Sequence, residues 1–218
     1  KSINLNDRSS YFLFDFDKAK LDEIPAFQYS TFVQLKELNN LRGINGMFAR
    51  INERLPENGT FVCCYKTLNT EKKIIYRKYP KIIAKIVYFN HFVKHRLIPK
   101  LLPTGQLYLD ITGGKKRTFS KTEILGRLSF AGFDIEKQVK VDDLNFVIAK
   151  RARNIQSFHT RIYGPFIKLE RIGKGGKPIN VYKMRTMHPY AEYLQSYVYE
   201  KYNLAEGGKF NRDIRVTS

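Results

Sequence analysis

The stretch from Ser120 to Lys150 constrains the fold more than any other part of this sequence. It begins with Ser120-Lys-Thr-Glu123, a capping box in which a serine and a glutamate satisfy the free backbone N–H groups at a helix start. Gly132 stands where that helix would end. Residues 133–141 and 144–150 then read as two strands joined through Asp142-Asp143. A capped helix followed by a terminal antiparallel hairpin indicates a sheet with helices packed on it.

The residues before this stretch also predict alternating helices and strands. Phe12, Phe14 and Phe16 alternate with other residues, which is typical of a strand. Apolar residues at steps of three or four predict a long amphipathic helix over residues 30–55. Residues 60–68 are expected to form a buried strand. This order predicts an α/β fold.

The remaining segments give further elements. Pro80 and Pro99 limit a basic helix to residues 81–98. Residues 106–112 alternate like another strand, and residues 166–172 and 179–184 predict a second hairpin. A last helix, opened by Pro189, carries a stripe of tyrosines that favours packing over the stacking of bases. Between these parts, residues 151–164 lose periodicity and predict a linker between domains 1–153 and 154–218.

The charge of the chain predicts an anionic partner. Lys and Arg number 39 against 20 Asp and Glu among 218 residues, a formal net charge of +19. Nucleic acid, an acidic lipid surface and phosphorylated substrates all fit that sign. The excess is concentrated in residues 71–100 and 113–117, with a second focus at residues 168–185. No recognition motif accompanies the charge, so no nucleic acid is expected.

The first basic focus contains a candidate membrane-surface helix. Residues 81–100 interleave isoleucines and phenylalanines with cations, a pattern typical of a helix that lies in a membrane interface. A core helix with a solvated basic face would show the same pattern. The residues expected at the membrane surface are Lys81, Lys85, Lys94 and Arg96.

Other motifs favour structural interpretations. His91 and His95 share a helical face, but no glutamate or third ligand accompanies them, so no metal site is expected and both count as further cations. Gly173-Lys-Gly-Gly-Lys-Pro178 lacks the Ser or Thr of a phosphate loop, which favours a tight turn. Cys63 and Cys64 are adjacent in a strand and point to opposite faces, so no mutual disulfide is expected.

The sequence predicts a cytoplasmic location for the chain. The cysteine usage fits a reducing compartment. No stretch reaches the roughly 18 apolar residues of a spanning helix. The chain begins at Lys1 without a signal-peptide pattern, so we expect a soluble piece of a longer protein.

The carboxyl-terminal part resembles the start of the bacterial sugar transferase family, the polyprenyl-phosphate hexose-1-phosphate transferases. The resemblance rests on Gly164-Pro165, Glu170-Arg171-Ile172-Gly173, a Gly-Lys-Pro turn, Lys183-Met-Arg-Thr-Met187 and Asp213-Ile-Arg-Val-Thr217. It implies transfer of a hexose-1-phosphate from a nucleotide sugar to undecaprenyl phosphate, with magnesium, for capsule, exopolysaccharide or O-antigen synthesis. It also implies a place at the inner face of the bacterial membrane.

Four residues are expected to hold the phosphates of such substrates. Lys183 and Arg185 lie two apart on one strand and so share a face, and Arg171 and Arg215 would complete the cluster. The family's catalytic Asp-Glu segment would follow Ser218, so no catalytic residue and no cofactor is expected within this chain.

Residues 1–153 resemble the carboxyl-terminal half of a class I methyltransferase. Residues 55–62 are similar to the strand that follows a Leu-x-x-Gly-Gly turn, and residues 120–151 to the last helix and closing hairpin. The expected fold is therefore a partial Rossmann-like sheet with a closing antiparallel hairpin, plus a small α+β piece. The glycine-rich turn and acidic residue that would bind S-adenosylmethionine are absent. A methyltransferase fragment and a basic, non-enzymatic module for membrane or nucleic acid remain as alternative functions.

Overall fold

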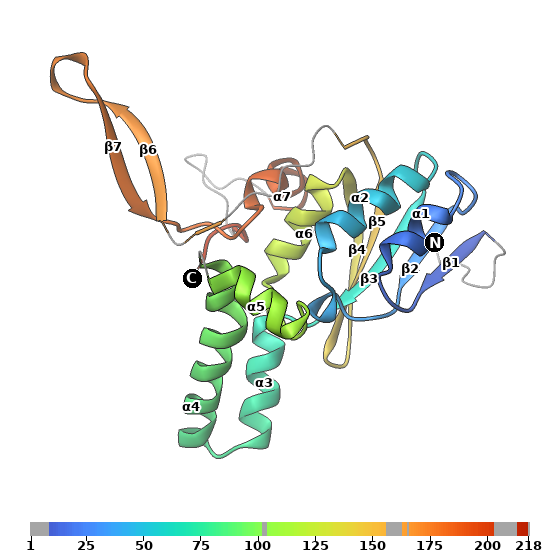
Figure 1. The fold of residues 1–218 in the computed structure, drawn as a ribbon, viewed down its shortest axis with the longest axis horizontal. Helices are drawn as coiled ribbons and strands as arrows, with labels where there is room; N and C mark the ends of the chain where they lie inside the picture. Colours follow the sequence, from blue (N-terminus) through green and yellow to red (C-terminus); the bar gives the residue numbers. More distant parts are fainter. Residues whose placement is uncertain (1–8, 102–103, 156–162, 165, 203–212, 218) are drawn as a thin grey trace.

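The computed structural model describes residues 9–101, 104–155, 163–164, 166–202 and 213–217. Its main sheet has five strands in the order β1-β2-β3-β5-β4. These are β1 (Ser10–Leu13), β2 (Thr31–Gln34), β3 (Thr60–Tyr65), β4 (Phe133–Val141) and β5 (Leu144–Arg151). Strands β1, β2 and β3 are parallel, whereas β5 is antiparallel to both of its neighbours. The expected Rossmann-like α/β sheet with a closing antiparallel hairpin is thus confirmed (Figure 1).

Helices pack on one face of this sheet and form the core with it. They are α1 (Lys18–Glu23), α2 (Ile44–Arg54), α6 (Lys121–Phe130) and α7 (Gln195–Lys201). Alternate strand residues meet them, because side chains of a strand point to opposite faces. The sheet supplies Leu13, Phe32, Phe61, Cys63, Tyr65, Phe133, Ile135, Val147 and Ala149 to this core.

The long helix expected over residues 30–55 is wrong in its first half. Residues Thr31–Gln34 form β2, whose four residues are all buried between β1 and β3. A central parallel strand is apolar on both faces, so its sequence cannot be distinguished from part of a buried helix by spacing alone. Gly43, with φ of 71°, adopts a left-handed conformation before α2 begins at Ile44.

The predicted capped helix and hairpin are confirmed. The Ser120 hydroxyl accepts a hydrogen bond from the Glu123 amide at 3.1 Å at the start of α6. Gly132, with φ of 84°, follows the helix in the left-handed region. Strands β4 and β5 then pair from Phe133 opposite Arg151 to Val141 opposite Leu144, with a bulge between Ile135 and Lys137.

Residues 68–101 and 104–112 form a projection that we call the helical arm. It contains α3 (Leu68–Lys78), α4 (Lys81–Phe92), a π-helical turn (Val93–Leu97), a 3₁₀ turn (Ile98–Lys100) and α5 (Thr104–Thr112). Figure 1 shows α3 and α4 side by side, extending away from the sheet. The strand predicted over residues 106–112 is wrong: those residues lie in α5, where Leu107 and Ile111 are one helical turn apart.

The second predicted hairpin is confirmed as β6 (Phe166–Ile172) and β7 (Pro178–Met184). It forms a sheet of its own and projects from the core (Figure 1). A 3₁₀ turn (Ala191–Leu194) then leads into α7, and Leu194 and Val198 join the main core. The division of the chain at residue 153 stays a prediction, and half of the predicted linker, residues 156–162, lies outside the described residues.

Both cysteines of β3 are free and buried. Burial raises the pKa of the Cys63 thiol strongly and that of Cys64 to about 11. In the described parts of the chain, no helix is both long and apolar enough to cross a membrane.

Candidate functional site

Helix α4 of the arm presents an apolar face to solvent. Ile82, Ile86 and Phe89 are 77%, 66% and 69% exposed. They recur at i, i+4 and i+7, so they lie on one side of the helix. Ala84, the one fully buried residue of α4, points the opposite way. Ile82, Ile83, Ile86 and Phe89 form what we call the apolar arm surface.

The orientation of α4 excludes the core-helix interpretation. At about 100° per residue, the centre of the apolar arm surface lies roughly 170° from Ala84. The amphipathic moment of the helix therefore faces away from the protein's own core. A helix that buried its apolar face in the core would show the reverse arrangement.

Three of the four cations predicted for the membrane surface are exposed. Lys85 lies on the flank of the apolar arm surface, Lys81 is exposed at the start of α4 nearer to the side of Ala84, and Lys94 is exposed in the π-helical turn. The prediction for Arg96 is wrong. Its guanidinium donates to Glu123 at 2.6 Å and to the Thr118 carbonyl at 2.9 Å, and its side chain is turned into the protein.

Arg96 belongs to a buried ion cluster at the base of the arm. Glu123 of α6 is fully buried and also accepts hydrogen bonds from Lys100 at 2.9 Å and Arg127 at 3.0 Å. Burial alone would raise the pKa of Glu123, but Lys100, Arg96 and Arg127 together hold it well below its usual value. Burial lowers the pKa of Lys100 to about 8. The cluster fastens the arm to the helical layer of the core.

His91 of α4 and His95 of the π-helical turn are both partly buried. Burial lowers the pKa of His91, and burial with the charge of neighbouring groups lowers that of His95 to about 4. The His95 ring nitrogen Nδ1 lies 2.9 Å from the Tyr108 hydroxyl. The interpretation of these residues as further cations is therefore wrong. Within the described residues, no group of three or more His, Cys, Asp or Glu side chains is placed to hold a metal ion.

The residues predicted to bind phosphate are not gathered into one cluster. Arg171 and Lys183 share a face of the β6–β7 hairpin, but four register steps, roughly 13 Å, separate them along the strands. Arg185 donates to the Gly164 carbonyl at 3.0 Å and stacks on the Tyr163 ring. Arg215 is buried and pairs with Asp213 at 2.8 Å. Arg185 and Arg215, two of the four residues predicted to bind phosphate, thus have partners within the protein.

The carboxyl ends of β1, β2 and β3 form the edge at which open α/β sheets bind ligands. The carboxylates at this edge already have partners. Asp15 pairs with Lys36 at 2.7 Å, and that hydrogen bond lowers the pKa of Asp15. Glu37 pairs with Lys66 at 2.8 Å. Phe14 follows β1 where a glycine-rich turn would stand.

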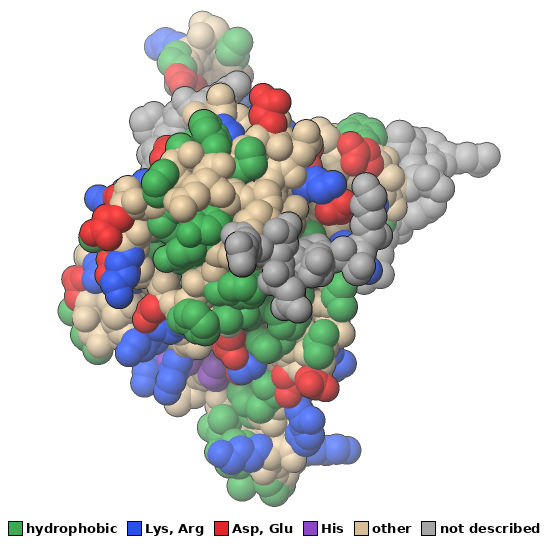
Figure 2. All heavy atoms as spheres, turned by 90° about the vertical axis from the view of Figure 1, so that its right-hand side faces the viewer, with side chains coloured by type: hydrophobic (Ala, Val, Ile, Leu, Met, Phe, Trp, Pro, Cys, Tyr) green, Lys and Arg blue, Asp and Glu red, His purple; other side chains and the backbone are tan. Residues whose placement is uncertain are grey.

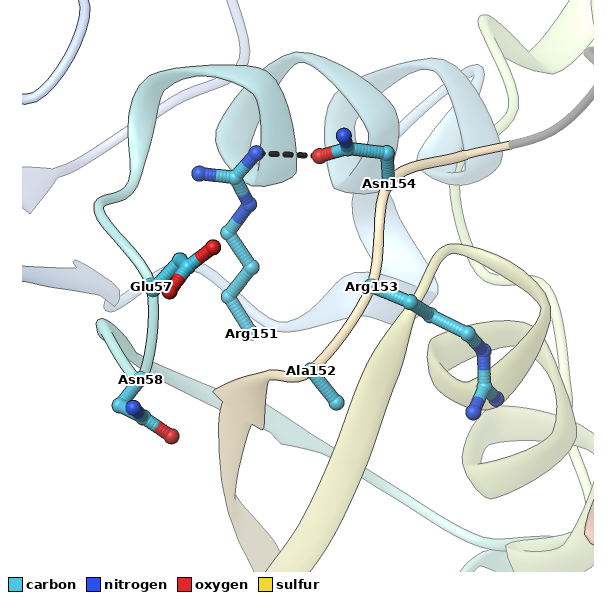
Figure 3. A pocket seen from close by; sticks show the side chains of 6 residues that line it. All are labelled: Glu57, Asn58, Arg151, Ala152, Arg153 and Asn154. Atoms are coloured by element: carbon cyan, nitrogen blue, oxygen red, sulfur yellow. Dashed lines mark hydrogen bonds between the residues drawn. The ribbon is translucent and has the colours of Figure 1, made fainter.

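A small hollow lies at the other end of the sheet. It measures about 260 Å³ and is lined by Glu57, Asn58 and Arg151–Asn154. Figure 3 shows Arg151 directed towards Asn154, whose side-chain oxygen accepts a hydrogen bond at 2.5 Å, while Arg153 points away. The hollow is polar, and its residues bring together no nucleophile and base. It offers no catalytic arrangement.

Neither a protein-family model nor a curated protein matches the chain. Several solved structures align with part of the chain. A putative type 11 methyltransferase from Sulfolobus solfataricus aligns over 64% of this chain and 59% of its own, with 10% identity and a TM-score of 0.36. An S-adenosylmethionine-dependent methyltransferase from Mesorhizobium loti aligns over 60% and 67%, with 14% identity and a TM-score of 0.37.

A third solved structure also aligns with part of the chain. An O-methyltransferase family protein from Burkholderia thailandensis aligns over 62% of this chain and 33% of its own, with 13% identity and a TM-score of 0.36. The chain thus spans less than two thirds of the first of these structures.

These comparisons correct the sugar transferase interpretation. The similar structures are described as methyltransferases, and no family model supports a sugar transferase. The interpretation is therefore wrong, and hexose-1-phosphate transfer, undecaprenyl phosphate and polysaccharide synthesis are set aside with it. The short motifs at residues 164–187 were too few to carry a family assignment.

Proposed function

We propose that this chain binds an anionic membrane surface peripherally through its helical arm, as a module built on a methyltransferase-like fold. One observation carries the proposal: the apolar arm surface faces away from the protein's own core, with Lys85 along its flank. Such a helix is suited to lie in a membrane interface, with its apolar side chains at the acyl boundary and its lysines among the headgroups.

The expected affinity is modest. Burying an Ile or Phe side chain contributes about 1.5–3 kcal/mol, and a lysine near an anionic leaflet contributes about 1 kcal/mol. Part of this gain is lost to the restriction of the protein's motion at the surface. A reversible, salt-sensitive contact in the micromolar to millimolar range of lipid is the expected outcome. The proposal includes a place at the cytoplasmic leaflet, whose negative potential attracts such lysines.

Nucleic acid binding is less well supported by the same surface. A nucleic acid is held by contacts from cations to its phosphates, and exposed isoleucines add nothing to such contacts. On the apolar arm surface, the three most exposed side chains are Ile82, Phe89 and Ile86.

The experiment is a vesicle cosedimentation assay with the full chain. Binding should be strong to phosphatidylcholine vesicles that contain phosphatidylglycerol, weak to pure phosphatidylcholine vesicles, and reduced by added salt. Ile86→Asp should abolish most of the binding. Phe14→Asp is the matched control, since Phe14 is equally exposed but lies at the sheet edge. Equal binding of the two variants, or tighter binding to duplex DNA than to vesicles, would refute the proposal.

Methyl transfer is the second candidate. The order and directions of the five strands favour it, because they match the sheet expected for half of a class I methyltransferase. The described residues do not fit S-adenosylmethionine, however: Asp15 and Glu37 are paired with lysines, and no glycine follows β1. We therefore derive no step through this cofactor. Saturable binding of S-adenosylmethionine in isothermal titration calorimetry would favour this candidate.

A further inference from the structure

The β6–β7 hairpin is a second exposed projection of the molecule. Its two strands pair only with each other in the described parts of the chain, and every residue of β7 is exposed. An isolated two-stranded hairpin is marginally stable in water. A surface that covers or contacts this hairpin would therefore stabilise it.

The tip of the hairpin combines an apolar side chain with cations. Ile172, at the end of β6, is 84% exposed, the highest value among the large hydrophobic residues described. Lys174 and Lys177 stand in the turn that follows it. The Gly173 amide donates to the Lys177 carbonyl at 2.8 Å, so the turn is closed and holds the tip in one conformation.

The positive charge of the hairpin indicates which kind of partner can contact its tip. Residues 166–184 carry five Lys or Arg side chains against one carboxylate, that of Glu170. A second copy of this chain would bring the same positive surface and be repelled. A bilayer containing anionic lipids offers phosphates to the lysines and an apolar boundary to Ile172, which is the pairing that this tip requires.

The two projections extend from the core in different directions. In Figure 1 the hairpin extends to the upper left and the helical arm downward, whereas β1 lies at the right-hand edge of the sheet.

We propose that the tip of the β6–β7 hairpin, at Ile172, is a second contact with the same anionic bilayer. This inference rests on the proposed function of the helical arm. Two linked contacts bind more tightly than either alone, because the second binds at a high effective concentration once the first is made; the gain reaches roughly 10²–10⁴-fold.

The chain contains no tryptophan, so a single introduced tryptophan reports on one place. The test compares Ile172→Trp, Ile86→Trp and, as control, Phe14→Trp, each in the full chain. The probe is a phosphatidylcholine vesicle with phosphatidylglycerol and brominated acyl chains, which quench tryptophan that reaches the acyl boundary. Quenching and a blue shift are expected at positions 172 and 86 but not at 14.

The outcomes separate the two proposals. Quenching at position 86 without quenching at 172 overturns the hairpin contact and leaves the arm proposal standing. Quenching at 172 alone overturns the arm and keeps the hairpin contact. Quenching at neither position overturns both. A blue shift at position 172 that grows with protein concentration without vesicles would instead show that a second copy covers the tip, and would also overturn the inference.

A pair of substitutions measures the contribution of the tip. Ile172→Asp should weaken vesicle binding roughly ten- to hundredfold, because it removes a buried isoleucine and adds a negative charge. Asn180→Asp adds the same charge to the middle of the hairpin without removing an apolar group, and should weaken binding only about fivefold. Equal effects of the two variants would mean that charge alone acts and that Ile172 does not enter the bilayer.

Discussion

Replacing Glu123 by Gln is expected to destabilise the protein by about 3–5 kcal/mol. Glu123 is fully buried and accepts hydrogen bonds from three cations, Arg96, Lys100 and Arg127. The amide of glutamine has nearly the same shape but carries no charge, so three neighbouring cations at the base of the arm would lose their shared counter-charge. Breaking a buried pair on one side costs more than the pair contributes, because the remaining charge stays desolvated.

The measurement is urea unfolding of the full chain followed by far-ultraviolet circular dichroism, with the midpoint and slope fitted for each variant. Glu53→Gln is the matched control, since Glu53 is 64% exposed and lies 3.9 Å from Arg54. That change should alter the free energy of unfolding by less than about 0.5 kcal/mol. If Glu123→Gln costs no more than Glu53→Gln, the cluster does not hold the arm to the core in the way described.

Three further predictions concern the core and its charges. Gly126→Ala should lower the free energy of unfolding by about 1–3 kcal/mol or more, since its Cβ would lie 2.3 Å from the Tyr190 carbonyl oxygen; Gly164→Ala, with open space around it, is the control in the same unfolding assay. Burial lowers the pKa of Lys100 from its usual 10.5 to about 8 in the folded protein. Between these two pH values, Lys100 is therefore protonated to a greater extent in the unfolded chain than in the folded protein. The contribution of Lys100 to stability should therefore rise with pH across that window, and the rise should be missing in Lys100→Met. Burial raises the pKa of Cys63, so its thiol should react with a disulfide reagent only after unfolding, and reaction in the native state would contradict the packing of β3.

The elements that sequence reasoning predicted well carry local signals. Ser120 and Gly132 mark both ends of α6, and the two aspartates after β4 mark its turn, with Asp142 at φ of 50°. These features depend on residues within a few positions of one another. The hairpin at residues 166–184 was predicted for the same reason, from the glycines of its turn.

The errors arose where tertiary contacts decide the structure. β2 is a strand because β1 and β3 supply its hydrogen bonds on both sides, which no local spacing reveals. Residues 106–112 alternate in sequence but form α5, where the Tyr108 hydroxyl donates to the Lys115 carbonyl at 2.9 Å. Short apolar runs of this kind satisfy both periodicities.

In the candidate site, too, local features could be predicted from the sequence and long-range contacts could not. The spacing of α4 predicted an amphipathic helix and left open whether its apolar face lies in the core; the structure shows that face exposed, and the membrane-surface role of Lys81, Lys85 and Lys94 stays a prediction. Arg96 could not be assigned from sequence, because its partner Glu123 is 27 residues away on another helix. A glutamate in a capping box is expected to return to its own helix start, and nothing local indicates that it serves three cations instead.

The outer edge of β4 is a place where a strand of another chain could pair with this sheet. An edge strand presents unpaired backbone groups that invite pairing with another chain. β4 carries exposed charged residues at Asp134, Glu136, Lys137 and Lys140, and its bulge lies between Ile135 and Lys137. Charges and a bulge both prevent a further strand from aligning along this edge. The closing hairpin therefore also protects the protein against edge-to-edge aggregation on this side, so that a mutant with neutral β4 side chains would be expected to lose solubility before it loses its fold.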